Sequence, residues 1–426
     1  MSAPTELLIS NIGRLATMNG EGAVLRDVAV LCAEGRVVYV GPESGVPAAS
    51  RVRERLDAGG RAVLPGLVDC HTHLVFAGDR RDEFALRCSG ATYAEIHAQG
   101  GGIVRTMRLT RDASEEELLL TAIRRAAAMV MRGVTTLEIK SGYGLSLDAE
   151  LKQLRVARAI EDHLPVRVIT TFLGGHSVPP EYRDRRADYI DLVCNEMIPR
   201  VVEEGLATFC DVFCEERVFS IAESERILLV AKAHGLGVKL HADQLTRTGA
   251  ARLGVALGAV SVDHLEQITA EDVALLGAHP ETVAVLLPAS VLFLRSQTYP
   301  PGRALVDAGA TVAISTDLNP GSSMCDDLPL MTTLGCTSLG LTPSEALRAV
   351  TAGAAAALGQ GGHLGCVTLG AAADLLVVGA DHEEALPYRF GRVAPHAVVS
   401  AGRVVVGPGL VPLGPPVTLS RARREA

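Results

Sequence analysis

The stretch LPGLVDCHTH, residues 64–73, joins an apolar run to a cluster of side chains that bind metals. Pro65 and Gly66 interrupt the run, and an acid, a thiol and two histidines follow at once. Successive side chains of a β-strand point to opposite faces, so we expect His71 and His73 to share one face. Two imidazoles on one face supply a metal ion with two ligands. The stretch therefore predicts a strand that leads into a metal site.

This stretch is the first of eight β-like apolar runs that alternate with segments of helical spacing. The eight runs are AVLPGLVDCHTH, VTTLEIK, VRVITTFLGGH, ATFCDVFCEE, LGVKLHA, AVSVDHLE, TVAVLLPAS and ATVAISTD. Amphipathic spacing between the runs is clearest in residues 114–132, 148–163, 221–234 and 343–358. Eight βα units predict a closed parallel barrel of the α/β class, a TIM-like (β/α)8 barrel. Near-continuous apolar strands agree with burial on both faces.

The two ends of the chain have a different pattern. Residues 5–64 and about 362–412 contain short β-like runs broken by Gly and Pro, without a long helical segment. We expect a small β-sandwich domain built from both chain ends, residues 1–64 plus 362–426, with the barrel of residues 65–361 inserted between them. The Ala- and Gly-rich TAGAAAALGQGG before the second segment predicts a close-packed helix and its end.

Composition argues against several classes of protein. The chain of 426 residues carries 40 basic and 49 acidic side chains, and its densest basic block is the short RARRE near the C-terminus, which speaks against a nucleic-acid partner. No uninterrupted apolar run reaches about 18 residues, which speaks against a membrane partner. The N-terminus does not resemble a secretory signal. Nine scattered cysteines, an odd number, favour reduced thiols in a cytoplasmic protein over disulfides or a zinc finger.

Potential metal ligands are concentrated at the C-terminal ends of the predicted strands, where barrel enzymes place their chemistry. Beyond His71 and His73, these ends carry His176, His241, Asp263, His264 and Asp317. Three imidazoles and one carboxylate, namely His71, His73, His241 and Asp317, form a plausible ligand set for a divalent metal with an open position for water. Such donors accept zinc or iron, and the sequence leaves the metal open. A hydrogen-bonded core histidine is the alternative for each residue alone, but their joint placement favours the metal site.

The motifs PGLVDCHTH, LHAD, DH and STDLNPG, in this order, resemble the amidohydrolase superfamily of metal-dependent barrel hydrolases. These motifs alone leave deaminases, hydantoinases and lactam hydrolases open. Further stretches, HTHLVFAGDRRDEF, GGGIVRTMRLTR, EIKSGYGL, TFLGGHSVP and STDLNPGSS, resemble the imidazolonepropionase family over nearly the whole chain. The resemblance implies a homodimeric hydrolase with one Zn²⁺ or Fe²⁺/Fe³⁺ per chain. Its activated water would open the ring amide of 4-imidazolone-5-propanoate to N-formimidoyl-L-glutamate in histidine degradation.

The resemblance also implies roles for individual residues. It assigns metal binding to His71, His73, His241 and Asp317, and substrate binding to Arg80, Tyr143, His176, Gln244, Asn319, Gly321 and Ser322. It assigns catalysis to Asp317, His264 and Gln244. Some relatives carry Glu where this chain has Gln244, and an amide can hydrogen-bond but cannot take a proton. We therefore expect proton transfer to fall on Asp317 and His264.

Three alternatives to these roles stay open. Arg80 has the forked guanidinium that binds a carboxylate, but it could instead form an ion pair with a neighbouring acid, Asp79, Asp82 or Glu83. Tyr143 lies between two glycines in a predicted loop and could serve packing alone. Lys140 could be carbamylated and bridge two metals, with Glu138 and His176 as further ligands. At the level of function, another cyclic-amide hydrolase, an aminoheterocycle deaminase and a catalytically silent barrel are the rivals.

Overall fold

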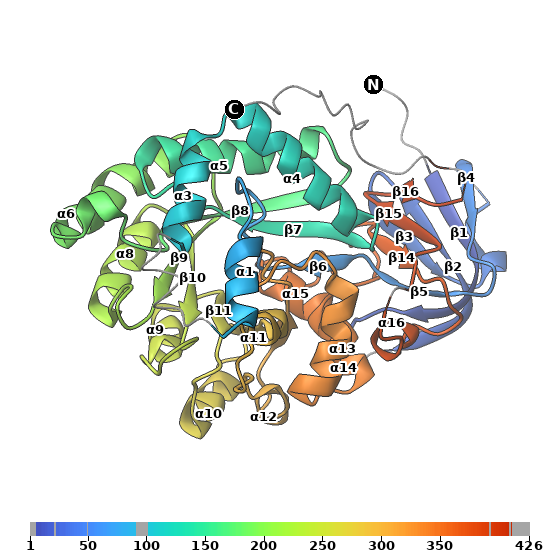
Figure 1. The fold of residues 1–426 in the computed structure, drawn as a ribbon. Coiled ribbons are helices and arrows are strands. Elements are labelled where there is room, and N and C mark those ends of the chain that lie inside the picture. Colours follow the sequence, from blue (N-terminus) through green and yellow to red (C-terminus); the bar gives the residue numbers. More distant parts are fainter. Residues whose placement is uncertain are drawn as a thin grey trace.

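The computed structural model describes residues 6–20, 23–48, 50–90, 101–391, 393–408 and 410. Two eight-stranded sheets organise these residues (Figure 1). One sheet comes from the middle of the chain and is surrounded by helices, and the other comes from the two chain ends. Within the described ranges, every helix is too short or too polar to cross a membrane.

The middle of the chain forms a parallel barrel whose strands follow one another in chain order. Its strands are β6 (Leu67–Asp69), β7 (Val134–Lys140), β8 (Arg167–Gly175), β9 (Phe209–Cys214), β10 (Gly237–Ala242), β11 (Ser261–His264), β12 (Val283–Leu286) and β13 (Val312–Ile314). All eight coincide with the predicted runs, and nearly every residue in them is buried. The barrel and the additional sheet confirm the predicted fold class.

The barrel closes where its first and last strands meet. Beyond the ends of β6 and β13, Thr72 and Leu318 form a parallel bridge. The amide of Asp317 donates to the carbonyl of His71 at 3.1 Å, and the amide of His73 donates to the carbonyl of Leu318 at 2.9 Å. The closing hydrogen bonds therefore involve the same segments that carry the predicted metal ligands.

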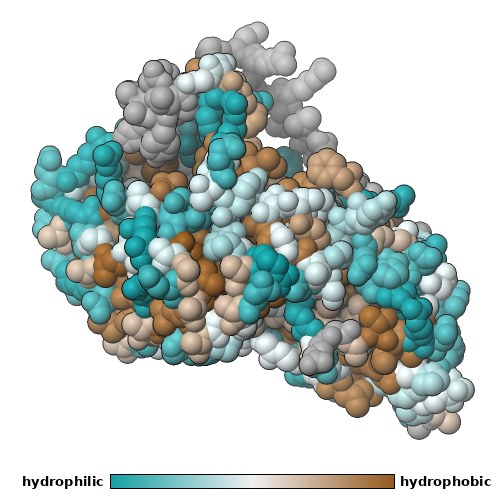
Figure 2. Space-filling view, turned by 90° about the horizontal axis from the view of Figure 1, so that it is seen from below, coloured by the Kyte–Doolittle hydropathy of each residue, from teal (hydrophilic) through white to brown (hydrophobic). Residues whose placement is uncertain are grey.

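Helices cover the outside of the barrel (Figure 1). They are α1 (Arg81–Cys88), α3 (Ile103–Asp112), α4 (Glu115–Val130), α5 (Leu147–Ala159), α6 (Arg186–Leu192), α7 (Ile198–Glu203), α8 (Ile221–Ala233), α9 (Ala250–Leu257), α10 (Ala270–Ala278), α11 (Pro288–Leu294), α12 (Gly302–Asp307), α13 (Leu328–Leu339), α14 (Pro343–Ala349) and α15 (Ala352–Ala356). Short turns of 3₁₀ or π type are η2 (Ile160–Asp162), η3 (Pro180–Tyr182) and η4 (Val193–Met197). The face shown in Figure 2 has hydrophobic and hydrophilic residues interspersed.

Capping residues explain where several of these helices begin. Ser114 accepts a hydrogen bond from the amide of Glu117, whose side chain bonds back to Ser114, so α4 starts with a capping box. Ser220 and Glu223 start α8 in the same way. The predicted helical segment 343–358 is divided instead: Thr351 has non-helical backbone angles and separates α14 from α15.

The chain ends together form a second sheet in the order β16-β15-β14-β5-β1-β2-β3, with β4 paired to β1. Its strands are β1 (Glu6–Ala16), β2 (Val24–Ala33), β3 (Arg36–Gly41), β4 (Val52–Asp57), β5 (Ala62–Pro65), β14 (Leu375–Val377), β15 (Ala397–Ser400) and β16 (Arg403–Val406), and η1 (Glu43–Gly45) and α16 (Ala385–Tyr388) lie between strands. A separate cluster of buried aliphatic side chains packs on this sheet. The domain limits 1–64, 65–361 and 362–426 stay a prediction.

Candidate metal centre

The two histidines of the opening motif lie just beyond the first barrel strand. We expected both on the strand, but β6 ends at Asp69. Beyond that residue the regular ladder stops, and Thr72 makes only isolated main-chain contacts, accepting from the amide of Lys140 at 2.8 Å and forming the bridge with Leu318. Both side chains still reach the barrel centre, because their Nε2 atoms each lie 3.6 Å from Oδ1 of Asp317.

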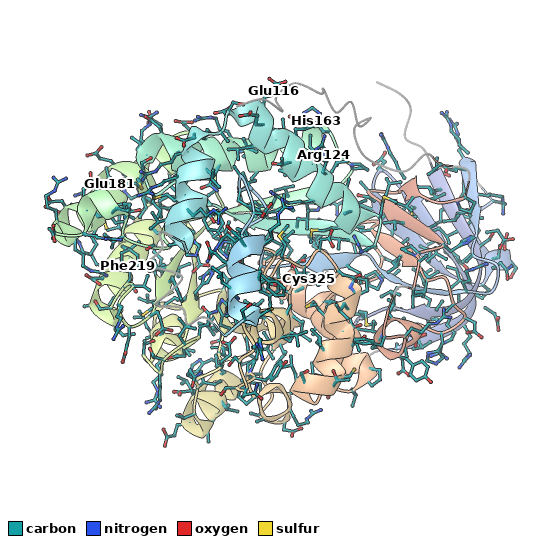
Figure 3. The ribbon with its side chains drawn as sticks, viewed as in Figure 1. Glu116, Arg124, His163, Glu181, Phe219 and Cys325 are labelled. Carbon is teal, nitrogen blue, oxygen red and sulfur yellow. The ribbon has the colours of Figure 1, made fainter. Side chains whose placement is uncertain are left out.

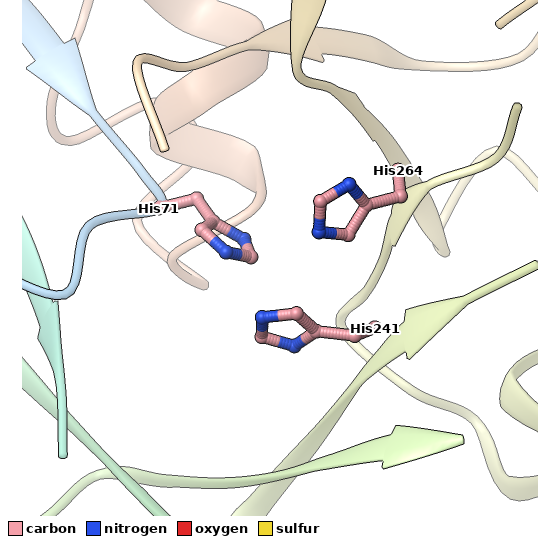
Figure 4. A group of neighbouring side chains, drawn as sticks. All are labelled: His71, His241 and His264. Atoms are coloured by element: carbon pink, nitrogen blue, oxygen red, sulfur yellow. The ribbon is translucent and has the colours of Figure 1, made fainter. Parts of the chain in front are cut away.

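His241 completes the predicted ligand set. It lies on β10, and its Nε2 is 3.4 Å from Nε2 of His73. Donor atoms about 2.1 Å from a tetrahedral zinc ion are separated by about 3.4 Å. The separations from Asp317 to His71 and His73 and from His73 to His241 are thus close to those of a shared metal. His264 also enters this group: its ring lies 5.2 Å from that of His241, and Figure 4 shows both rings facing His71.

The protonation of this group is suitable for binding a cation. Burial, together with Lys140, holds the pKa of His71 well below its usual value, and burial together with His176 does the same for His73. Burial raises the pKa of Asp317 to about 6, so its carboxylate is still mainly ionised at neutral pH. Nε2 of His71 is fully buried and forms no hydrogen bond among the described residues. The neutral imidazoles of His71 and His73, facing the carboxylate of Asp317, fit a divalent metal.

Two further carboxylates hold two of the histidines in place: Asp263, which the sequence placed at a strand end without a role, and Asp211, which it did not single out. Oδ2 of Asp263 lies 2.6 Å from Nδ1 of His71. Oδ2 of Asp211, on β9, lies 3.0 Å from Nδ1 of His241. Each contact sets the imidazole so that its Nε2 faces the centre, which is how ligand histidines are usually oriented.

A buried lysine lies between these carboxylates. Nζ of Lys140, at the end of β7, is 2.8 Å from Asp211, 3.1 Å from Glu138 and 3.5 Å from Asp263, and all four side chains are fully buried. Nζ of Lys239 lies 2.8 Å from the other oxygen of Glu138. Three carboxylates around the Lys140 amine favour its charged ammonium form. This arrangement is a buried ion network rather than the carbamate of a two-metal site.

His264 and Gln244 lie at the ends of neighbouring strands. Nδ1 of His264 is 3.5 Å from Glu266, and although burial lowers the pKa of His264, the carboxylates of Glu266, Asp317 and Asp263 together raise it. His264 and Leu265 have positive φ angles of 84° and 72°, a strained backbone of the kind found at functional sites. Gln244 is half-buried beyond β10, and its main-chain carbonyl lies 3.5 Å from Nε2 of Gln267.

Tyr143 lies in a loop that α5 holds rigidly. Glu150, fully buried on α5, accepts hydrogen bonds from the amides of Gly142, Gly144 and Leu145 at 2.7–3.2 Å. Gly142 has a φ of 105°, which a residue with a side chain rarely adopts. The Tyr143 ring lies 5.9 Å from His73 and 5.4 Å from His176, whose pKa burial lowers to about 3. The loop therefore presents Tyr143 and neutral His176 beside the ligand set.

Replacing Glu150 by glutamine should weaken this loop. The amide nitrogen of glutamine cannot accept from main-chain N–H groups, so in either orientation at least one of the four contacts is lost and a donor faces a donor. We expect the free energy of unfolding to fall by about 1–2 kcal/mol and KM to rise with little change in kcat. Urea denaturation and steady-state kinetics measure both effects. Glu116, exposed on α4 (Figure 3), is the control position, and unchanged stability of the Glu150 variant would contradict the assigned contacts.

The segment after β13 carries the remaining predicted residues. Oδ1 of Asn319 accepts from the amides of Gly321 and Ser322 at 2.8 Å each, and its Nδ2 donates to the carbonyl of Asp317 at 2.8 Å. The hydroxyl of Ser322 lies 3.3 Å from Oδ2 of Asp317. Arg80 forms the ion pair with Glu83 that the sequence left open, at 2.7 Å, and also lies against Gly321. The structure thus brings Arg80 to the same loop as the ligand carboxylate.

Histidines and cysteines that were not assigned to the site lie away from the centre or outside the described residues. His163 is exposed at the outer surface (Figure 3), and His97 lies outside the described residues. All nine cysteines are free, including Cys210 and Cys214 in the barrel core.

Comparisons with known proteins agree with this geometry. A model of the amidohydrolase family matches residues 62–405. The chain is 47% identical to an imidazolonepropionase of Symbiobacterium thermophilum, covering 96% of this chain and 99% of that protein. It is 46% identical to an imidazolonepropionase of Myxococcus xanthus, covering 94% and 97%.

Solved structures share the fold at lower identity. An adenosine deaminase from Xanthomonas campestris with bound zinc has a TM-score of 0.72 at 22% identity, covering 95% of this chain and 93% of that one. An atrazine chlorohydrolase from Arthrobacter aurescens complexed with zinc has a TM-score of 0.71 at 19% identity, covering 96% of each chain. With the family match over most of its length and imidazolonepropionases among its near full-length relatives, the chain belongs to the amidohydrolase family.

Proposed function

We propose that this protein hydrolyses the ring amide of 4-imidazolone-5-propanoate and releases N-formimidoyl-L-glutamate, a step of histidine degradation. The observation that carries the proposal is the near full-length similarity to imidazolonepropionases at 44–49% identity. The convergence of three imidazoles, Asp317 and an arginine at one end of the barrel supports it, because the reaction needs each of these groups.

The metal ligands in this proposal are His71, His73, His241 and Asp317. A divalent cation held there would make water a nucleophile near neutral pH and polarise the ring carbonyl. Asp263 and Asp211 orient the imidazoles of His71 and His241. We propose one Zn²⁺ or iron ion per chain, since nitrogen and carboxylate donors accept either metal.

Asp317 and His264 move the protons. Asp317 turns Oδ1 towards the histidine ligands and Oδ2 towards Ser322, so one carboxylate can bind and also accept the proton of the attacking water. It then hands this proton to the leaving ring nitrogen. His264 lies across the ligand group and donates to the developing oxyanion. Gln244 contributes a hydrogen bond but no proton transfer.

The remaining residues bind the substrate. Arg80 pairs with the propionate, for which a chain of net charge −9 needs a local cation. Tyr143 and His176 lie next to His73 and would contact the substrate ring. Asn319, Gly321 and Ser322 shape the loop that contacts substrate or product.

Metal content and turnover of the purified protein test this function together. We expect about one zinc or iron per chain and an ultraviolet signal of imidazolonepropanoate consumption that a chelator abolishes and added metal restores. A chelator-treated sample with an excess of metal present throughout is the control. A metal-loaded protein that leaves this substrate untouched would favour another cyclic-amide hydrolase or an aminoheterocycle deaminase. A folded protein that retains no metal would favour a catalytically silent barrel.

We also propose that the protein works in the cytoplasm as a homodimer. The nine free cysteines support a reducing compartment. The dimer follows from the resemblance to the family, and light scattering on the eluting protein tests it.

A further inference from the structure

Arg80 and its surroundings form an ordered arrangement that the proposed reaction leaves unexplained. Its side chain is only 11% exposed, and that of Glu83, one turn along at the start of α1, is 4% exposed. A single oxygen of Glu83, Oε2, accepts from Nε of Arg80 at 2.8 Å and lies 2.7 Å from its Nη2. The second oxygen, Oε1, accepts from the amide of Gly102 at 3.1 Å. Both oxygens are therefore committed inside the protein.

The other side of the guanidinium faces the loop after β13. A methyl group at position 321 would overlap Nη1 of Arg80, so the guanidinium occupies the space that a side chain at Gly321 would need. Nη2 of Arg87 donates to the carbonyl of Gly321 at 3.0 Å and holds this loop against α1. Arg80 is thus confined between Glu83 and the loop that also carries Asn319.

Charge balance in this region favours an anionic ligand. Arg80 and Arg87 are close enough for the charge of Arg80 to lower the pKa of Arg87, although burial is the larger cause. Glu83 is the only carboxylate paired with either guanidinium among the described residues. Nη1 of Arg87 is buried without a hydrogen-bond partner in the same part of the chain. The two guanidinium groups and the one carboxylate carry a net positive charge, which a ligand with one negative group would neutralise.

We propose that Glu83 is a positioning residue that holds Arg80 by one edge and so directs its free edge at the substrate carboxylate. This inference rests on the proposed function, in which Arg80 binds the propionate. Competition between Glu83 and the propionate is the opposite hypothesis. It requires Glu83 to leave Arg80, but a departing Glu83 would lose two hydrogen bonds and stay buried. Positioning therefore outweighs competition.

The test compares two ligands that differ only in the charged group. The probes are 3-(imidazol-4-yl)propanoate and its neutral amide, and binding to the metal-loaded protein is measured by calorimetry. We expect Glu83→Ala to raise Kd for the carboxylate about tenfold and to leave Kd for the amide within about twofold. With the enzyme's own substrate, KM should rise by a similar factor at nearly unchanged kcat. Arg80→Ala removes the guanidinium itself and should give the largest rise in Kd for the carboxylate.

Two further variants separate positioning from folding. Glu83→Gln keeps the shape and one of the two acceptor oxygens, so we expect an intermediate rise in Kd for the carboxylate and a Kd for the amide within about twofold of the wild type. Asp82→Asn is the matched control, because Asp82 is the preceding residue and pairs outward with Arg105 at 2.5 Å. It should change neither ligand's affinity.

The outcomes that would contradict the inference are specific. Unchanged or tighter binding of the carboxylate in Glu83→Ala would make Glu83 a bystander or a competitor. Equal weakening of both ligands would make its role merely structural. Calorimetry needs no turnover, so a wild-type protein that fails to hydrolyse imidazolonepropanoate would overturn the proposed function, while the ratio of the two affinities would still decide the role of Glu83.

Discussion

Asp317→Asn is expected to lower kcat for 4-imidazolone-5-propanoate about a thousandfold or more. Asparagine can neither accept the proton of water nor return it to the ring nitrogen. The fold should survive, because Asp317 has a φ of 52° and asparagine tolerates this left-handed conformation as aspartate does. The measurements are steady-state kinetics, metal content per chain and thermal unfolding of the same preparation.

The same substitution at an exposed position is the control for Asp317. Asp307 on α12 is 65% exposed and pairs with Arg303 at 2.8 Å, and Asp307→Asn should leave kcat unchanged. An Asp317→Asn protein that keeps its metal and loses turnover would separate proton transfer from metal binding. A variant that keeps kcat within about tenfold of the wild type would remove Asp317 as the general base.

Lys140→Met is expected to lower the free energy of unfolding by about 3–5 kcal/mol. Methionine fills much of the same volume but leaves Glu138, Asp211 and Asp263 without their shared ammonium group in a fully buried layer. Breaking one partner out of a buried ion network costs far more than removing a surface pair, because the remaining charges cannot be solvated. Urea denaturation followed by circular dichroism measures the change.

A surface ion pair provides the contrast. Arg155 on α5 lies 2.9 Å from Glu115, and the two side chains are 41% and 51% exposed. Arg155→Met should change the free energy of unfolding by less than about 1 kcal/mol. If Lys140→Met proved as mild as Arg155→Met, the buried carboxylates would be neutral acids and the ion network would be absent.

Sequence reasoning predicted the barrel and the clustering of the candidate ligands because both depend on position along the chain. Eight apolar runs with helices between them specify a parallel barrel, and the ends of parallel strands meet on one face. Sequence reasoning could therefore place His241 and Asp317 beside His71, although any two of these three residues are more than 70 positions apart in the chain. The end of the first strand at Asp69 was not predicted. Beyond it, Thr72 pairs with Leu318, and a local sequence pattern cannot reveal a partner so distant in the chain.

The supporting residues could not be assigned because a buried charge has no periodic signature of its own. Glu138 and Lys140 share one face of β7, and Lys239 and His241 share one face of β10, so the spacing of two did contain a clue. This clue could be interpreted only from the pairing of neighbouring strands, which places Asp211 on β9 opposite Lys239 on β10. Likewise, Glu150 holds the Tyr143 loop by accepting hydrogen bonds from main-chain amides. The pattern of side chains in a sequence gives no sign of such bonds.

The bridge that closes the barrel has a consequence for how the chain acquires its metal. His71 comes just before Thr72, and Asp317 comes just before Leu318, the two residues of the bridge. The amide of Asp317 donates to the carbonyl of His71, so one main-chain hydrogen bond joins them. If His71 and Asp317 bind the metal as proposed, a chain whose last strand has not yet docked on the first would offer it an incomplete set of ligands. Because a ligand that binds only one state stabilises that state, metal binding would then stabilise the closed barrel over the open one. The proposed metal site would thereby couple metal binding to closure of the barrel.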